Sequence, residues 1–129
     1  LVTSGSGATN LVTGIADANY DGIPLVCFTG QVATSVIGND AFQEVDIVGI
    51  TRTISKYSTT IRKREDLGRA IKEAFYIART GKPGPVIVDL PSNIVSEIGP
   101  AEYPETVNIR GYKPSTGVHI GQIKKALEM

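Results

Sequence analysis

Two short, nearly continuous apolar runs place the tightest limit on how this chain folds. They lie at residues 23–29 and 85–90. Apolar runs of this length are typical of strands that are buried on both faces, as in a parallel sheet covered by helices. Apolar residues at helical spacing precede each run, within residues 8–20 and 65–79. This order predicts an α/β fold, a three-layer sandwich with a mostly parallel sheet.

Weaker signals complete the order of elements. Residues 1–3 are typical of the end of a strand, and residues 42–50 favour a short helix. Thr, Ile and Tyr are frequent in residues 51–61, which favours a strand near residues 54–60. Gly22 suits the left-handed position that ends the first long helix.

The character of the sequence changes at Ser92. Glycines and prolines then interrupt the chain repeatedly, which predicts an extended linker that crosses a domain surface. From Thr116 a new helix is expected, with Ile120, Ile123 and Leu127 on one side, as the start of a second domain. The first residue is Leu1 rather than Met, and both ends fall within a pattern, so we expect a fragment of a longer protein.

Composition excludes several classes of function. The formal net charge is zero, so no basic field favours nucleic acid or an anionic membrane as a partner. No apolar run approaches the roughly 20 residues that span a bilayer, and no signal-peptide pattern is present. The single cysteine, Cys27, excludes a disulfide framework or a cysteine zinc site within one chain, and we expect a buried thiol.

The turn Gly5-Ser6-Gly7 precedes a helix, which is the pattern of backbone amides that face a ligand. It does not fit the dinucleotide fingerprint, because Asn10 stands where the third glycine belongs, and it lacks the lysine of a P-loop. Without further support the turn is as consistent with local chain reversal as with ligand binding.

Three polar or aromatic residues follow the first apolar run: Gln31, Phe42 and Gln43. Loops after parallel strands open at the carboxyl edge of the sheet, where such folds bind ligands. The Gln43 amide is suited to a heterocycle and the Phe42 ring to an apolar wall. Ordinary loop packing explains the same residues equally simply.

Two other candidates have simple interpretations. Lys82 is typical of a solvated charge after a helix, and His119, the single histidine, of a helix start. No nucleophile elbow, zinc motif or Ser-His-acid set is present. The residues alone therefore predict an α/β chain with a candidate ligand site at its strand ends, and name no reaction.

Several segments together resemble the large catalytic subunit of acetolactate synthase (acetohydroxyacid synthase), a thiamine-diphosphate enzyme family. They are Ser4-Gly5-Ser6-Gly7-Ala8-Thr9-Asn10, Gly30-Gln31-Val32, Asp40-Ala41-Phe42-Gln43-Glu44, residues 46–52, Glu73-Ala74-Phe75, residues 81–86 and residues 110–114. The Asp-Ala-Phe-Gln-Glu segment favours this enzyme over pyruvate oxidase, sulfoacetaldehyde acetyltransferase or glyoxylate carboligase. These relatives, and a non-catalytic α/β binding or assembly module, are the alternatives.

The resemblance implies a domain plan. Residues 1–95 would be the later part of a thiamine-diphosphate pyrimidine-binding domain with an incomplete fold, residues 96–115 a linker, and residues 116–129 the first helix of a central, flavin-binding domain. It also implies the decarboxylating condensation of two pyruvates, or of pyruvate and 2-oxobutyrate, in branched-chain amino acid biosynthesis. The activating glutamate is expected upstream of Leu1, so Glu44 does not replace it, and the fragment itself is expected to be inactive.

The resemblance assigns roles to individual residues. Ser6, Asn10 and Gln43 would lie at the cofactor, with Gln43 also at the reacting substrate, and Lys82 would touch FAD where relatives often have arginine. Gln31, Phe42 and Ser92 would line the substrate channel. Ser6 and Ala33 stand where the family usually has proline, and Ser92 where many relatives have lysine. The departure at Ser6 would alter the contact with the cofactor ring without abolishing it. The departures at Ala33 and Ser92 leave channel and inhibitor properties open more than the reaction.

The resemblance further implies FAD and Mg2+, the latter bound outside this chain, and a homodimer or homotetramer, with a regulatory small subunit as a further partner. The expected location is the cytoplasm of a bacterium or archaeon, or a plastid or mitochondrion of a eukaryote.

Overall fold

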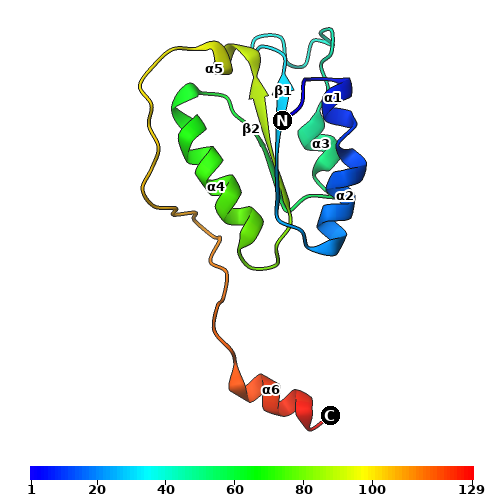
Figure 1. Ribbon diagram of the computed structural model, residues 1–129, viewed down its shortest axis with the longest axis vertical. Coiled ribbons are helices and arrows are strands. Elements are labelled where there is room, and N and C mark those ends of the chain that lie inside the picture. The colour runs from blue at the N-terminus through cyan, green and yellow to red at the C-terminus, as the bar shows by residue number, and fades with distance from the viewer.

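The computed structural model describes residues 1–129 as a three-stranded parallel sheet with helices on both faces, followed by a linker and a separate helix (Figure 1). The strands are β1 (Leu25–Gln31), β2 (Tyr57–Thr60) and β3 (Pro85–Pro91). The helices are α1 (Ser6–Thr9), α2 (Val12–Asp21), α3 (Ile47–Thr51), the 3-10 turn η1 (Arg64–Asp66), α4 (Leu67–Arg79), α5 (Ser92–Ser96) and α6 (Ile120–Leu127).

The central strand of the sheet is β3, with β1 on one side and β2 on the other. Both pairings are parallel, and Thr29 of β1 and Thr60 of β2 lie level with Asp89 of β3. The N-terminal segment runs beside β1, where Val2 forms an isolated parallel bridge with Thr29. The predicted α/β fold with a parallel sheet is therefore confirmed.

Two apolar layers hold helices to the sheet. Val86 and Val88 face α4, where they pack with Ala70, Ala74 and Ile77. Ile87 faces the opposite way and packs with Ile15 of α2 and the buried Cys27. Burial raises the pKa of the Cys27 thiol, in keeping with the expected core position. Figure 1 shows α1, α2 and α3 on one face of the sheet and α4 on the other.

The first predicted helix is in fact two. The chain leaves the α-helical pattern at Asn10 and Leu11, where the N–H of Leu11 donates to the carbonyl of Ala8, three residues back, at 3.1 Å. The hydrogen bond of the shorter 3-10 type separates α1 from α2. Gly22 then ends α2 in the left-handed conformation, as expected, with φ of 67°.

Element boundaries differ from the predictions for local reasons. β1 begins at Leu25 rather than at residue 23, because Pro24 has no N–H to donate to a ladder. α3 begins at Ile47, where the side chain of Asp46 accepts a hydrogen bond from Gly49 N–H at 2.8 Å and caps the helix. After Pro91 the chain was expected to be extended, but the short helix α5 follows at once. The predicted boundary at residue 95 therefore falls inside α5.

The segment after α5 crosses the outer surface of α4, and specific contacts hold it there. The guanidinium of Arg64 donates to the carbonyl of Pro100 at 2.8 Å. The ammonium of Lys72 donates to the carbonyl of Glu105 at 2.7 Å and lies 4.9 Å from the centre of the Tyr103 ring. Near the end of the linker, the Tyr112 hydroxyl donates to the carbonyl of Thr80 at 2.9 Å.

The last helix, α6, stands apart from the sheet, and all of its residues are exposed (Figure 1). His119 caps it by accepting the N–H of Gln122 on Nδ1 at 3.2 Å, which agrees with the helix-start role predicted for this residue. Its apolar residues Ile120, Ile123 and Leu127 are exposed. No helix of the structure is long and apolar enough to cross a membrane.

The Tyr112→Phe substitution tests the attachment of the linker. It removes the hydroxyl that bonds Thr80, so the free energy of unfolding should fall by about 1 kcal/mol, and proteases should cleave the linker faster. Tyr103→Phe is the matched control, because the Tyr103 side chain is 61% exposed and its hydroxyl has no hydrogen bond in the structure. Limited proteolysis and urea unfolding measure both effects, and equal cleavage rates for the two variants would refute the attachment.

Candidate functional site

A buried polar network joins the three strands at the carboxyl end of the sheet. The carboxylate of Asp89 on β3 is 1% exposed. It accepts the hydroxyl of Thr29 at 2.7 Å, the amide of Gln31 at 3.2 Å and the hydroxyl of Thr60 at 3.1 Å. Donors from β1 and β2 therefore meet one acceptor group on the strand between them, and this fixes the level at which the strands end.

Burial and hydrogen bonding act on Asp89 in opposite directions. Burial disfavours its charged form and raises the pKa above the ordinary aspartate value, while the hydrogen bonds from Thr29, Gln31 and Thr60 oppose this rise. The raised pKa of Asp89 shows that desolvation outweighs the three donors. The carboxylate is enclosed by these donors, so it acts as a structural acceptor.

Gln31 completes the network at the tip of β1. Its Nε2 also donates to the carbonyl of Val45 at 2.8 Å, and its Oε1 accepts the N–H of Val32 at 2.9 Å. Every polar group of this side chain is therefore engaged within the chain. Gln31 holds the loop after β1 to the segment that leads into α3.

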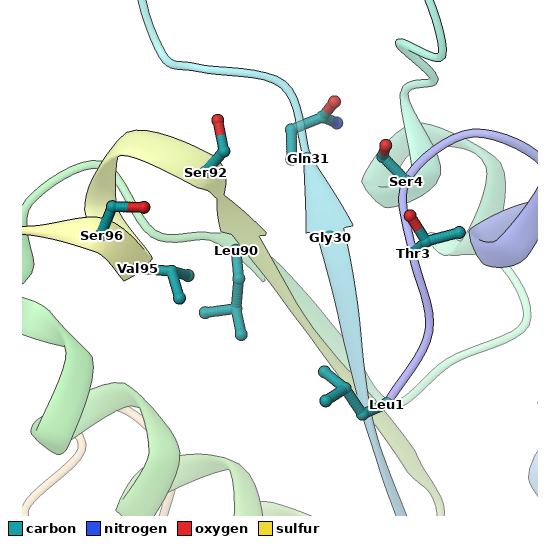
Figure 2. A pocket seen from close by; sticks show the side chains of 9 residues that line it. All are labelled: Leu1, Thr3, Ser4, Gly30, Gln31, Leu90, Ser92, Val95 and Ser96. Carbon is teal, nitrogen blue, oxygen red and sulfur yellow. The ribbon is translucent and has the colours of Figure 1, made fainter.

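A cleft of about 360 Å³ opens at the same edge of the sheet (Figure 2). It lies between the N-terminal segment and α5, with Gly30 and Gln31 at its floor. Figure 2 shows Ser4, Gln31 and Ser92 around one end of it, and Leu1, Leu90 and Val95 toward the other. Its lining combines hydroxyl groups with aliphatic side chains, which suits an organic ligand that carries both polar and apolar parts.

The cleft is braced across its rim. Asn93 of α5 accepts the N–H of Thr34 at 2.9 Å, and its amide donates to the Thr34 hydroxyl at 3.0 Å. These two hydrogen bonds join α5 to the loop that follows β1. The two strand ends that flank the cleft are thus fixed relative to each other.

The turn at Gly5 touches the second edge loop. Gly5 adopts φ of 61° and ψ of −117°, a conformation that side-chain-bearing residues avoid. A Cβ atom at this position would lie 3.0 Å from the carbonyl oxygen of Gln43 and 3.1 Å from its Cα. Glycine is therefore needed at position 5 for two reasons. It can adopt this backbone conformation, and it leaves room for the backbone of Gln43.

The loop that carries Phe42 and Gln43 is organised by its own carboxylate. Glu44 accepts the N–H of Ala41 at 3.0 Å and also the N–H of Gly38. These backbone hydrogen bonds, with Gly38 the larger cause, hold the pKa of Glu44 below the ordinary glutamate value. Phe42, in this loop, is 89% exposed.

The structure groups the predicted site residues into two neighbouring sets and one distant residue. Gln31 and Ser92 line the cleft. Ser6 begins α1 directly after the Gly5 that contacts Gln43, with Phe42 beside Gln43. Asn10 ends α1 one turn later and is exposed. Ser4 of the cleft and Gly5 are adjacent, so both sets lie at the carboxyl edge.

Lys82 lies at the opposite edge of the sheet. It precedes the amino end of β3, and its Cε is 4.0 Å from the position of a Cβ on Gly22. The sheet therefore separates Lys82 from Gln31, Ser92 and Gln43. Any ligand that Lys82 contacts must reach this second edge.

The sequence analysis missed two structural supports of the site. One is Asp89, for which the available signal was a lone carboxylate inside the apolar run of β3. The other is the carboxylate of Glu44, whose partners are backbone groups within its own loop. Backbone donors leave no signature in sequence spacing.

The Gly5 turn and the cleft are neighbours at the carboxyl edge of the sheet. The Gly5 turn is a place where a side chain would collide with Gln43, so two backbones approach closely there. The adjacent cleft offers hydroxyl groups and an aliphatic wall. The structure contains no group of three or more His, Cys, Asp or Glu residues that could hold a metal ion.

Comparison with known proteins gives the family context. Residues 1–50 match the family model described as "Thiamine pyrophosphate enzyme, N-terminal TPP binding domain". The acetolactate synthase isozyme 3 large subunit of Escherichia coli is 54% identical over 130 residues, covering 99% of this chain and 23% of the relative. The acetolactate synthase large subunit of Haemophilus influenzae is 52% identical, with 99% and 23% covered.

A relative with lower identity matches a region of similar length. The acetolactate synthase of Mycobacterium leprae is 46% identical over 129 residues, covering 100% of this chain and 21% of the relative. The chain thus spans about a quarter of the length of the relatives it matches. The similarity includes both loops at the carboxyl edge.

Gly5→Ala tests the contact between the two loops. The added methyl group must displace the Gln43 backbone and occupy a disfavoured conformation, so the free energy of unfolding should fall by about 1–3 kcal/mol. Gly14→Ala is the control, because Gly14 lies in the first turn of α2 and nothing lies within 4 Å of a Cβ at this position. It should stabilise the chain by up to about 0.5–1 kcal/mol. Urea unfolding compares the two, and a neutral Gly5→Ala would contradict the close approach.

Asp89→Asn tests the buried network and its pH dependence. The amide of Asn replaces one acceptor oxygen by a donor, which should reduce the free energy of unfolding by about 1–3 kcal/mol. Because the pKa of Asp89 is raised in the folded state, the folded chain binds more protons at this residue than the unfolded chain does. The contribution of Asp89 to the free energy of unfolding therefore falls as pH rises from about 4 through its raised pKa. The stability advantage of the wild-type chain over Asp89→Asn should therefore shrink as pH rises. Unfolding curves across this range check the sign, and a growing advantage would refute it.

Proposed function

We propose that this chain belongs to the thiamine pyrophosphate enzyme family, whose model matches residues 1–50, and forms the pyrimidine-binding side of an acetolactate synthase catalytic subunit. The observation that carries the proposal is the 54% identity that extends over 99% of the chain to a relative of that name. The contact between the Gly5 turn and the Gln43 loop supports it, because it places two of the similar segments side by side at one edge.

The proposed activity is that of a transferase, the decarboxylating condensation of two pyruvates, or of pyruvate and 2-oxobutyrate. When bound, thiamine diphosphate supplies the nucleophilic carbon for this chemistry. The residues of this chain position and enclose it: Asn10 and Gln43 offer side-chain amides, Ser6 lies at the start of α1, and Phe42 supplies an apolar wall. Gln31 and Ser92 belong to the neighbouring cleft, where substrate would enter.

The proposed domain plan has its first boundary in the last turn of α5, just before the extended segment begins. Residues 1–95 form part of the pyrimidine-binding domain, residues 96–115 the linker and residues 116–129 the first helix of the central domain. Mg2+ and most contacts to FAD belong to other parts of the enzyme. Lys82 is the proposed flavin contact of this chain, and its place at the amino edge keeps that contact separate from Gln43.

The proposed assembly is a homodimer or homotetramer, with a regulatory small subunit as a further partner. The exposed Phe42, in a loop whose backbone is hydrogen-bonded, supports a surface that another chain completes. The proposed location is the cytoplasm, by analogy with the bacterial relatives.

A chimera tests the proposed function. The 129 residues replace the matching segment of the Escherichia coli isozyme 3 large subunit, and acetolactate formation from pyruvate is measured with added thiamine diphosphate, Mg2+ and FAD. We expect activity in the chimera, loss of most of it in Gln43→Ala, and none in the 129-residue chain alone.

The same chimera separates the alternatives. Sulfoacetaldehyde and glyoxylate are offered in place of pyruvate, and use of either in preference to pyruvate would assign the chain to a different carboligase. A folded, cofactor-saturated chimera without any activity would overturn the proposal in favour of a non-catalytic module. Activity of the isolated chain would contradict the view that it supplies one side of the site.

A further inference from the structure

The loop between β1 and α3 contains two residues in a strained backbone conformation. Asp40 has φ of 52° and Gln43 has φ of 61°, and neither is glycine. A left-handed conformation at such residues is costly and persists only where the surrounding structure holds it. Gln43 is one of the residues that the proposed function places at the cofactor, so what holds its backbone matters for that function.

Glu44 supplies the restraint from within the loop. One carboxylate oxygen accepts the N–H of Gly38 and the other accepts the N–H of Ala41 at 3.0 Å, so the carboxylate bonds the chain on both sides of Asp40. The N–H of Glu44 in turn donates to the carbonyl of Ala41 at 2.9 Å. The strained segment is thus closed by three hydrogen bonds that involve a single residue.

The Gly5 turn supplies the restraint from outside. The Gln43 backbone lies against Gly5 so closely that a Cβ atom there would be within 3.1 Å of its Cα. The backbone of Gln43 is therefore held from two directions. Its side chain and that of Phe42 are exposed, as required of groups that contact something outside this chain.

We propose that Glu44 is a positioning residue, whose carboxylate fixes the Gly38–Gln43 backbone so that Gln43 and Phe42 face the cofactor and substrate. This inference rests on the proposed function for its ligand. Glu44 does not act on the substrate, because both of its oxygens are engaged by backbone donors. Those donors also lower its pKa, which keeps the carboxylate ionised at neutral pH and unsuited to proton transfer there.

The discriminating variant is Glu44→Gln, which keeps the size of the side chain but replaces one acceptor oxygen by a donor. The amide then opposes one of the two N–H groups and releases the loop. The matched control is Glu73→Gln, which removes the same charge from a carboxylate that accepts both of its 3.1 Å hydrogen bonds from Arg69 on α4.

The first measurement uses nuclear magnetic resonance on the 129-residue chain. In Glu44→Gln we expect amide exchange at Gly38 and Ala41 to be faster by on the order of tenfold, with altered HN–Hα couplings at Asp40 and Gln43. Unchanged resonances of Val86 and Val88 show that the sheet still folds. If Glu44→Gln does not fold, Glu44→Asp, which keeps the charge on a shorter side chain, is used for the same comparison. Unchanged exchange and couplings would overturn the proposal.

The second measurement uses the chimera with acetolactate synthase activity. Misplacement of a group at a reacting centre costs up to about 10²-fold, so we expect Glu44→Gln to lower kcat by at least about tenfold while the KM for pyruvate changes less. Glu73→Gln should leave both parameters within about twofold, as expected for surface changes.

The two measurements distinguish a failure of the positioning role from a failure of the proposed function. Full kcat in Glu44→Gln, with an active parent chimera, would overturn the positioning role and leave the proposed function intact. An inactive parent chimera would refute the proposed function, and the role of Glu44 toward a ligand would be refuted with it. A loop that loosens in solution together with a fall in kcat would support the proposal.

Discussion

The buried carboxylate of Asp89 is the constraint on which the rest of the structure depends. A parallel sheet of three strands offers no hairpin to set the register, so side chains must fix the level at which its strands end. Asp89 does so by accepting donors from both neighbouring strands at once. A buried acceptor left without its donors costs more free energy than the hydrogen bonds themselves contribute, which makes this register hard to shift.

This register determines what the carboxyl edge presents. At the end of β1, the side-chain amide of Gln31 donates hydrogen bonds to Asp89 and to the carbonyl of Val45. The loop after β1 therefore leaves the sheet in a defined direction. That loop returns toward the N-terminal turn, where only the absence of a side chain at Gly5 permits the backbone of Gln43 to approach. The edge therefore has a rigid support of buried polar groups and exposed tips at Phe42 and Gln43. Binding residues commonly lie on loops that a rigid scaffold positions in this way.

The amount of the fold that sequence predicts differs between elements for physical reasons. The apolar runs of β1 and β3 and the helical spacing of α4 report burial directly, and the structure confirms them. The break between α1 and α2 and the short helix α5 after Pro91 depend on local hydrogen bonds that spacing does not report.

The same distinction applies to the candidate site. Strand order places Gln31 at the carboxyl edge, as the sequence predicts for a loop after a parallel strand, and Ser92 of α5 lines the same cleft. The internal use of the Gln31 amide and the separation of Lys82 from the other candidates emerge only from tertiary structure. The support from Glu44 is invisible in sequence because its partners are N–H groups that every residue but proline carries. The roles of Ser6, Asn10 and Gln43 toward a ligand stay predictions.

The central claim is that the Gly5 turn and the Gln43 loop together hold the pyrimidine end of thiamine diphosphate. Hydrogen exchange of the chimera with and without thiamine diphosphate, followed by mass spectrometry, tests it most directly. The account predicts that the cofactor slows exchange in residues 4–10 and 38–44 and leaves the outer surface of α4 unchanged. Protection elsewhere, with none in these two segments, would contradict it.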